Sequence, residues 1–213
     1  RQRQMCIRDR CHLDILRLFG PVPAEATSVP ILPYVETVTK ELHRHVNFDG
    51  YKARLIADLE NAEGLLKQHL EKQSEIEEDY FKYRTIRMNY YAVKALKARV
   101  YLWADNKAEA YREAKAVTAV QEQWFPWTER REIMDNTRNP DRIFSSELLF
   151  AAYYNAREEI FTNYFSPTLE PAQVYSPKKH IDDLFTWDLL DWRNRPIWLE
   201  GTTRDYRCFH KYE

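Results

Sequence analysis

The sequence has very little glycine: only 4 Gly occur among its 213 residues. Loops that bind phosphate groups need several glycines at fixed spacing, because only glycine lets the backbone approach a phosphate closely. Neither the GxGxxG pattern nor GxxxxGK followed by Ser or Thr occurs in the chain. The glycine-dependent nucleotide-binding loops are therefore excluded, and we expect no cofactor.

Long apolar runs and an excess of charge are also missing. A transmembrane helix needs about 20 predominantly apolar residues, and no such run is present in a chain whose mean hydropathy is -0.68. The formal net charge is -1, and the basic residues form no stripe along one face. Such a chain has no electrostatic field that would recruit nucleic acid, so we expect no nucleic-acid partner.

The three cysteines, Cys6, Cys11 and Cys208, form neither an even disulfide framework nor a CxxC pair. The first ten residues, RQRQMCIRDR, show neither helical nor strand periodicity and resemble translated sequencing-adapter sequence. We interpret residues 1–10 as a non-native tail. No apolar signal precedes Cys6 or Cys11, so neither lies in a lipobox. We expect the chain to be an internal fragment that is incomplete at its C-terminus.

Apolar periodicity predicts two helices in the first third of the chain. In HLDILRLFGPVP, Leu13 and Leu16, with Ile15 and Phe19 beside them, form an apolar helical face that a Gly-Pro pair ends. A proline-rich, extended connector follows. The second helix carries a longer stripe at steps of three and four residues, made of Tyr51, Leu55, Leu59, Ala62 and Leu66.

The stretch RMNYYAVKALKARVYLWADNKAEAYREAKAV predicts a helical hairpin. Asn89 is the expected N-cap of its first helix, and Asp-Asn in ADNK forms the turn because these residues tolerate a left-handed backbone. So short a connection makes the two helices antiparallel neighbours, and small residues let them approach closely. We expect Lys94 and Lys97 to face solvent. The expected apolar faces consist of Ala92, Ala95, Leu96, Arg99 and Leu102 in the first helix, broadened by Val93, Val100 and Trp103, and of Ala110, Ala114 and Val117 in the second.

The sequence after Val120 is less regular. ELLFAAYY, residues 147–154, predicts an extended strand, and a last helix is expected to begin with Ser176 as N-cap and Pro177 at its first position. Almost half of the aromatic residues fall in residues 150–213, so not all of them can belong to a core. We divide the chain into a helical-repeat scaffold, residues 11–125, and an irregular segment, residues 126–213.

No set of residues predicts catalysis or a metal site. His43 and His45 form an HxH pair without a further Cys or His cluster, and the acidic run EIEED is typical of a solvated surface. Ser145 and Ser146 lack the GxSxG elbow of a serine nucleophile. We therefore expect no catalytic residue, no metal and no enzymatic activity.

Several segments occur in a characteristic order: HLDILRLFGPVP, PYVETVT, YKARLIADLENAEGLL, the hairpin above, DRIFSSELLFAAYY and DWRNRPIW. This order, from His12 to Tyr212, resembles the SusD/RagB family of outer-membrane nutrient-binding lipoproteins. The resemblance implies a mostly α fold of tetratricopeptide-like helical hairpins with long irregular, aromatic-rich loops. It also implies a protein at the surface of the outer membrane, held by a lipid anchor that this fragment lacks. Such proteins cover a SusC-like TonB-dependent transporter and bind oligosaccharides or other nutrients without chemistry.

Sugar binding requires flat apolar faces for the C–H side of the ring and a few polar groups for the hydroxyls. Aromatic side chains in residues 126–213, the expected ligand-facing segment, are the natural candidates; the alternative for each is packing of a loop onto the helices. Candidate polar partners are Asn155, Asn163, Arg157, Asp191 and Arg195. The predicted ligand-binding residues are Tyr154, Tyr164, Tyr175, Trp187, Trp192 and Trp198.

A generic tetratricopeptide-like protein-interaction module is the alternative, because the hairpin alone fits it equally well. Against it, solenoids need about three repeats to bury a continuous core, and only one repeat is clear in the sequence. A lipoprotein signal upstream in the complete gene would exclude an intracellular module.

Overall fold

The computed structural model describes residues 2–72, 84–134, 140–168, 174–188, 191, 194, 197–201 and 205–210. The chain divides into two compact units. The helical unit consists of Arg1–Phe125 and Leu149–Ala151, and the C-terminal unit consists of Pro126–Leu148 and Ala152–Glu213. Within the described ranges, no helix combines the length and the apolar character that crossing a membrane requires.

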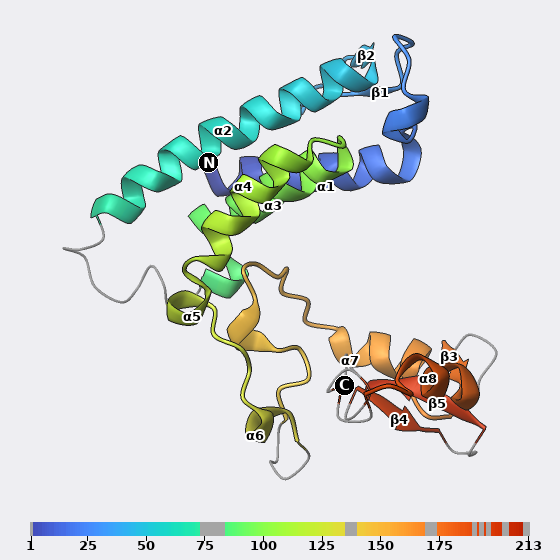
Figure 1. Ribbon diagram of the computed structural model, residues 1–213. Coiled ribbons are helices and arrows are strands. Elements are labelled where there is room, and N and C mark those ends of the chain that lie inside the picture. Colours follow the sequence, from blue (N-terminus) through green and yellow to red (C-terminus); the bar gives the residue numbers. More distant parts are fainter. Residues whose placement is uncertain are drawn as a thin grey trace. The chain divides into compact units, whose positions relative to one another are not determined.

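Helices build the first unit. α2 packs against both α1 and α3, and α3 and α4 form an antiparallel hairpin (Figure 1). The chain is mostly α, with only short strands, which confirms the predicted fold class. The helices of this unit are α1 (Gln2–Phe19), α2 (Phe48–Lys72), α3 (Tyr90–Trp103), α4 (Lys107–Thr118) and α5 (Gln121–Trp124).

The apolar stripe of α2 forms the centre of the core. Tyr51, Leu55 and Leu59 are fully buried, and Ala62 and Leu66 continue the same face. Each leucine buried in this way stabilises the fold by about 2 kcal/mol through the hydrophobic effect. These residues join buried side chains of α1 and α3 in one cluster. The stripe predicted from the period of the sequence is confirmed.

The first helix is longer than the sequence suggested. The sequence of residues 1–10 shows no helical periodicity, yet α1 extends back through them to Gln2. Cys6 and Asp9 are buried and precede Leu13 and Leu16 at helical spacing on the same face. That face was missed because two of its four positions are not aliphatic. The origin of residues 1–10 as a non-native tail stays a prediction.

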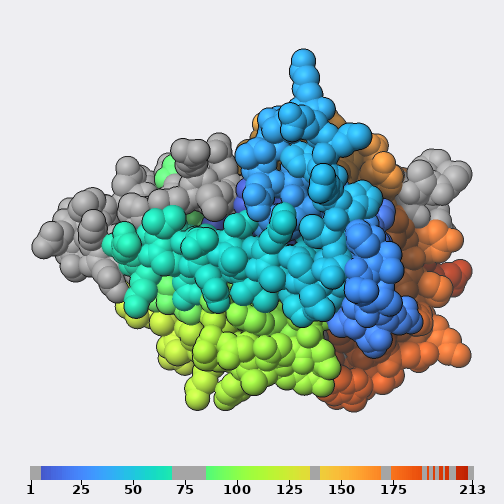
Figure 2. Space-filling view, turned by 90° about the horizontal axis from the view of Figure 1, so that it is seen from above, coloured from blue at the N-terminus to red at the C-terminus, as the bar shows by residue number. Residues whose placement is uncertain are grey.

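A connector joins α1 to α2. The Gly20 N–H donates to the Leu16 carbonyl over 2.9 Å, and a Cβ at Gly20 would lie 2.5 Å from that oxygen, so the predicted glycine end of α1 is confirmed. The connector then pairs β1 (Leu32–Pro33) with β2 (His45–Val46) in an antiparallel ladder. In Figure 2, the surface of α2 lies between this connector and the α3–α4 hairpin.

The beginning of the hairpin and its turn both follow the prediction. The Ala92 N–H donates to the side-chain oxygen of Asn89 over 3.0 Å, which confirms Asn89 as the N-cap of α3. Asp105 has a φ of 57°, the left-handed backbone expected of this turn. The side chain of Asn106 then caps α4. Short polar side chains thus set both the beginning of the hairpin and its reversal.

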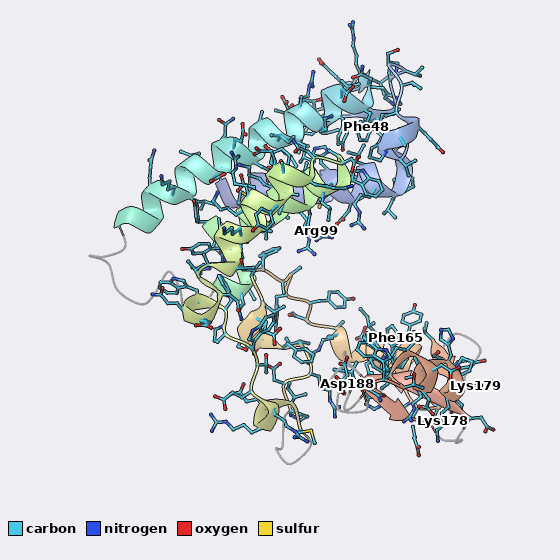
Figure 3. The ribbon with its side chains drawn as sticks, in the orientation of Figure 1. Phe48, Arg99, Phe165, Lys178, Lys179 and Asp188 are labelled. Atoms are coloured by element: carbon cyan, nitrogen blue, oxygen red, sulfur yellow. The ribbon has the colours of Figure 1, made fainter. Side chains whose placement is uncertain are left out.

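The predicted apolar faces of the hairpin are partly wrong. Arg99, Leu102 and Ala114 are exposed, and Arg99 projects from α3 in Figure 3. Because α3 faces both α2 and α4, it buries more than a single stripe. The buried positions are Ala92, Val93, Leu96, Lys97, Val100 and Tyr101 of α3, and Ala110 and Glu113 of α4.

Four charged side chains meet inside the helical unit, so the expected solvent exposure of Lys94 and Lys97 is wrong. The Lys94 Nζ lies 2.6 Å from Glu63 of α2 and 2.8 Å from Glu113 of α4. The Lys97 Nζ lies 2.7 Å and 3.0 Å from the same two carboxylates. Burial alone would lower the pKa of Lys94, but the hydrogen bonds to Glu113 and Glu63 and their charges outweigh it and raise that pKa. This charge cluster joins α2, α3 and α4.

The C-terminal unit combines short helices with a small sheet. Its three strands are antiparallel and lie in the order β3–β5–β4. Its elements are α6 (Arg130–Ile133), a 3-10 turn (Ser145–Glu147), α7 (Arg157–Ile160), a π-helix (Phe161–Phe165), β3 (Tyr175–Pro177), α8 (Lys178–Leu184), β4 (Trp198–Glu200) and β5 (Tyr206–Phe209).

Two local predictions for this part of the chain are wrong. Residues 147–154 form no strand: Glu147 ends a 3-10 turn, and residues 148–154 have no regular secondary structure. The last helix begins one residue late, at Lys178, because Ser176 and Pro177 belong to β3, and no side chain caps α8. In both cases the outcome depends on whether a partner strand is present, which local sequence does not specify.

Candidate ligand-binding surface

The register of the small sheet places two predicted ligand-binding residues on opposite faces. Tyr175 is paired with Cys208, and Trp198 is paired with Phe209. Paired residues of an antiparallel sheet point to the same face, whereas consecutive residues point to opposite faces. Tyr175 and Trp198 therefore cannot form one continuous aromatic platform.

Tyr175 is a half-exposed ring held against a buried one. Its ring centroid lies 5.4 Å from that of Tyr206, with the two planes at 62°. Tyr206 is 4% exposed, and its hydroxyl donates to the Pro167 carbonyl over 2.8 Å. Tyr175 itself is 49% exposed. The tyrosine is thus supported from the protein side and leaves about half of its surface for a ligand.

Tyr164 lies close to Tyr175 in the fold. The Val174 N–H donates to the Tyr164 carbonyl over 2.5 Å, so the backbones of the two tyrosines are neighbours. Tyr164 belongs to the π-helix and is exposed, whereas two phenylalanines of the same helix pack inward. Phe161 contacts His210, and Phe165, which is labelled in Figure 3, contacts Phe209 on the sheet. The structure brings these two predicted residues together.

The remaining predicted aromatic residues are dispersed. Trp187 follows α8 and is 80% exposed, while Trp198 is partly buried, with its ring centroid 5.0 Å from that of Phe209. Tyr154 is exposed in the irregular segment before α7, next to Tyr153, which is more exposed still. Trp192 lies outside the described residues. Among the described members of the predicted set, Trp198 is partly buried and packs on the sheet, whereas the others are exposed.

The predicted polar partners are also separate. Asn155, Arg157 and Asn163 are exposed on the segments around α7, and Asp191 is partly buried. Arg195 lies outside the described residues, so its role as a polar partner stays a prediction.

One buried cation was missed by the sequence analysis. Arg207 of β5 is 4% exposed, and its guanidinium donates to Asp182 of α8 over 2.9 Å. The pair ties the helix to the sheet face that also carries Trp198 and Phe209. Next to it in β5, the buried Cys208 has a thiol pKa raised by desolvation. No local signal marks Arg207, because its partner lies 25 residues earlier in the chain.

The described side chains of the C-terminal unit include exposed aromatic rings that can contact a ligand. Within the described ranges, no group of three or more His, Cys, Asp or Glu residues is placed to hold a metal ion. The half-exposed Tyr175 and Tyr164 offer apolar ring faces and hydroxyl groups. Such surfaces can stack on a sugar ring and bond to its hydroxyls.

The helical unit has a separate surface feature. A shallow groove of about 330 Å³ runs between α3 and α4. Its lining includes three alanines, whose small side chains leave space between the two helices. Its lining consists of Ala98, Arg99, Leu102, Lys107, Ala110, Tyr111 and Ala114.

Comparison with known proteins supports the fold. Neither a protein-family model nor a curated protein matches the sequence. Among solved structures, the chain is similar to a SusD superfamily protein from Bacteroides thetaiotaomicron VPI-5482, with a TM-score of 0.52 and 20% sequence identity. The match covers 74% of this chain and 32% of that chain. The chain therefore has a SusD-like fold and spans about a third of the length of its solved neighbour.

Proposed function

We propose that the chain is part of a nutrient-binding protein at the surface of the outer membrane. It captures oligosaccharide and delivers it to a SusC-like TonB-dependent transporter. The observation that carries this proposal is the set of exposed aromatic rings in the C-terminal unit of a SusD-like fold. Exposed rings in such number favour a binding surface, because aromatic side chains are otherwise mostly buried.

The proposed mechanism is capture without bond making or breaking. Tyr164, Tyr175 and Trp187 provide apolar ring faces for the C–H side of a pyranose ring, and exposed polar side chains such as Asn163 bond to its hydroxyls. Binding is reversible, so a transporter can take the ligand over. On this proposal the protein is not an enzyme.

Calorimetry with a panel of soluble oligosaccharides tests the proposal. We expect at least one to bind, and Tyr175→Ala or Trp187→Ala to weaken binding about tenfold, which corresponds to about 1.4 kcal/mol. Tyr111→Ala is the matched control, because Tyr111 is 67% exposed but lies on α4 of the helical unit. If the complete protein bound no oligosaccharide or other nutrient and no transporter copurified with it, the proposal would be wrong.

A tetratricopeptide-like protein-interaction module remains the second candidate, and the α3–α4 groove is the observation that favours it. The two functions are separated by Arg99→Glu, which reverses an exposed charge in the lining of the groove, and by a pull-down of protein partners with the two chains. An interaction module would lose its protein partner in the variant. A nutrient binder that uses the C-terminal unit would keep both its oligosaccharide binding and the proteins that copurify with it.

A further inference from the structure

Gly201 lies against a buried aromatic ring with no room for a side chain. A Cβ at this position would lie 2.7 Å from Cδ2 of Tyr206, and closer still to Cε2 and Cζ. Real Cβ atoms do not approach other atoms so closely, and a buried ring cannot move aside freely. Gly201 therefore has a steric role. Gly64 has none, because nothing lies within 4 Å of a Cβ at that position.

Tyr206 is fixed by contacts on several sides. Its hydroxyl donates to Pro167, its carbonyl accepts the Gly201 N–H over 3.3 Å, and its ring occupies the space above Gly201. Tyr206 also lies opposite Pro177 in the β3–β5 ladder, on the same face as Tyr175. The position of the buried ring is therefore set by the backbone around it.

Tyr175 takes its orientation from this ring. The two residues are diagonal neighbours on one face of the sheet and meet at 62°, edge against face. An edge contact of this kind restrains the plane of the exposed ring. A ring that is already oriented loses less conformational entropy when a ligand stacks on it than a freely rotating one does. Trp187, at 80% exposed, has much less of its surface held by the protein.

We propose that Tyr175 is the main stacking ring for a pyranose residue, and that Tyr206 and Gly201 are positioning residues that set its plane. This inference rests on the proposed function and assigns the ligand contact to one of the predicted residues. Tyr164 is exposed, and its carbonyl accepts the N–H of the residue before Tyr175, so its backbone lies next to this ring. Selectivity for flat, equatorially substituted sugar rings follows, because only these present a continuous apolar C–H face to a fixed ring.

The test combines calorimetry of the whole chain with fluorine NMR of fluorotyrosine incorporated at position 175. The probe is the soluble oligosaccharide that binds best in the panel described above. We expect Tyr175→Phe to bind within about threefold of the unmodified chain and Tyr175→Ala to bind about tenfold more weakly. Gly201→Ala should weaken binding by a similar factor and shift the fluorine resonance, although it does not contact the ligand.

Gly64→Ala is the matched control and should change neither reading, because a Cβ meets open space there. Should Gly201→Ala fail to fold, Tyr206→Phe keeps the ring but removes its bond to Pro167, and we expect it to shift and broaden the fluorine resonance.

An unchanged resonance in Gly201→Ala or Tyr206→Phe overturns the positioning role. Loss of binding in Trp187→Ala but not in Tyr175→Ala overturns the choice of ring. A chain that binds no oligosaccharide overturns the proposed function and the ligand contact together, while the resonance still decides the positioning role.

Discussion

The Lys97 ammonium lies 2.7 Å from a carboxylate oxygen of Glu63 and 3.0 Å from one of Glu113, so one side chain of α3 joins α2 to α4. Both Lys97 and Glu113 are almost fully buried. A buried cation is tolerated only when it is paired, because removal from water costs several kcal/mol per charge. Together with Lys94, the cluster contains two positive and two negative charges and is neutral overall. It ties the hairpin to the preceding helix in a defined register.

Lys97→Met should destabilise the helical unit by about 3 kcal/mol, because the buried Glu113 and the partly buried Glu63 then share a single lysine. The measurement is the free energy of unfolding in urea, followed by far-UV circular dichroism. Lys52→Met is the matched control: Lys52 pairs with Asp49 at 2.8 Å, but Asp49 is 79% exposed. We expect the control to lose less than about 1 kcal/mol. Equal losses in the two variants would show that the buried cluster has no special role.

The same cluster predicts how stability depends on pH. Burial would raise the pKa of Glu63 and Glu113, but hydrogen bonds and charges from Lys94 and Lys97 lower both pKa values overall. Their contribution is therefore complete above the unfolded pKa of about 4.3 and is lost as pH falls through the lowered folded pKa. The lysine pKa values are raised, so their contribution is complete below the unfolded pKa of about 10.4 and is lost as pH rises through the folded values.

We therefore expect the cluster to contribute a constant stability between about pH 5 and pH 10. The reference variant replaces the four residues by Leu and Met. Its unfolding free energy, subtracted from that of the unmodified chain, should be flat across this window. Below about pH 4 the unmodified chain should lose unfolding free energy relative to the reference variant. A slope near neutral pH would contradict the assignment of these pKa shifts.

The cluster also shows which parts of the fold the sequence could predict. The stripe from Tyr51 to Leu66 was predicted because apolar residues recur at helical steps, a property of local sequence alone. Lys97 was assigned to solvent because a lysine usually lies there. Its partner Glu63 lies 34 residues earlier, and no local pattern reveals that pair. The apolar core was thus accessible from the sequence, whereas the buried polar contacts were not.

Asn89→Ala should cost about 2 kcal/mol, at the upper end for loss of an N-cap. Asn89 is buried, its side-chain oxygen accepts from Ala92, and its amide donates to the Leu149 carbonyl over 2.9 Å. The variant leaves the partly buried Leu149 carbonyl without this donor. Asn106→Ala, at the exposed cap of α4, should cost only about 0.5–1 kcal/mol. Urea unfolding of both variants measures the difference, and a larger loss for Asn106→Ala would argue against the second bond of Asn89.

Trp198→Ala and Trp187→Ala should separate packing from surface exposure. Trp198 packs on Phe209, so its removal should destabilise the C-terminal unit by about 2 kcal/mol. Trp187 is 80% exposed, and its removal should change stability by no more than about 0.5 kcal/mol. Thermal unfolding, followed by near-UV circular dichroism, measures both. The reverse order of stability would contradict the described packing of the sheet.

The candidate site illustrates the same limit of sequence analysis. Composition and irregularity correctly indicated that residues 150–213 expose aromatic rings. Which of these rings share a surface depends on strand register, and the pairing of Tyr175 with Cys208 spans more than thirty residues of chain. A shift of β3 by one residue against β5 would move Tyr175 to the face that carries Trp198. The sequence therefore predicted the kind of surface but not its arrangement.

Asp105→Gly should stabilise the helical unit by about 0.5–1 kcal/mol, because Asp105 has a φ of 57° and glycine adopts this backbone without steric strain. The lost ion pair to Lys107 is highly exposed at both ends and contributes little. Ala108→Gly is the matched control, three residues further along in helical backbone, where glycine should destabilise by about 1 kcal/mol. The two substitutions thus introduce the same residue with opposite expected signs. Urea unfolding measures both, and destabilisation by Asp105→Gly would show that the aspartate side chain stabilises the turn by more than its backbone strain costs.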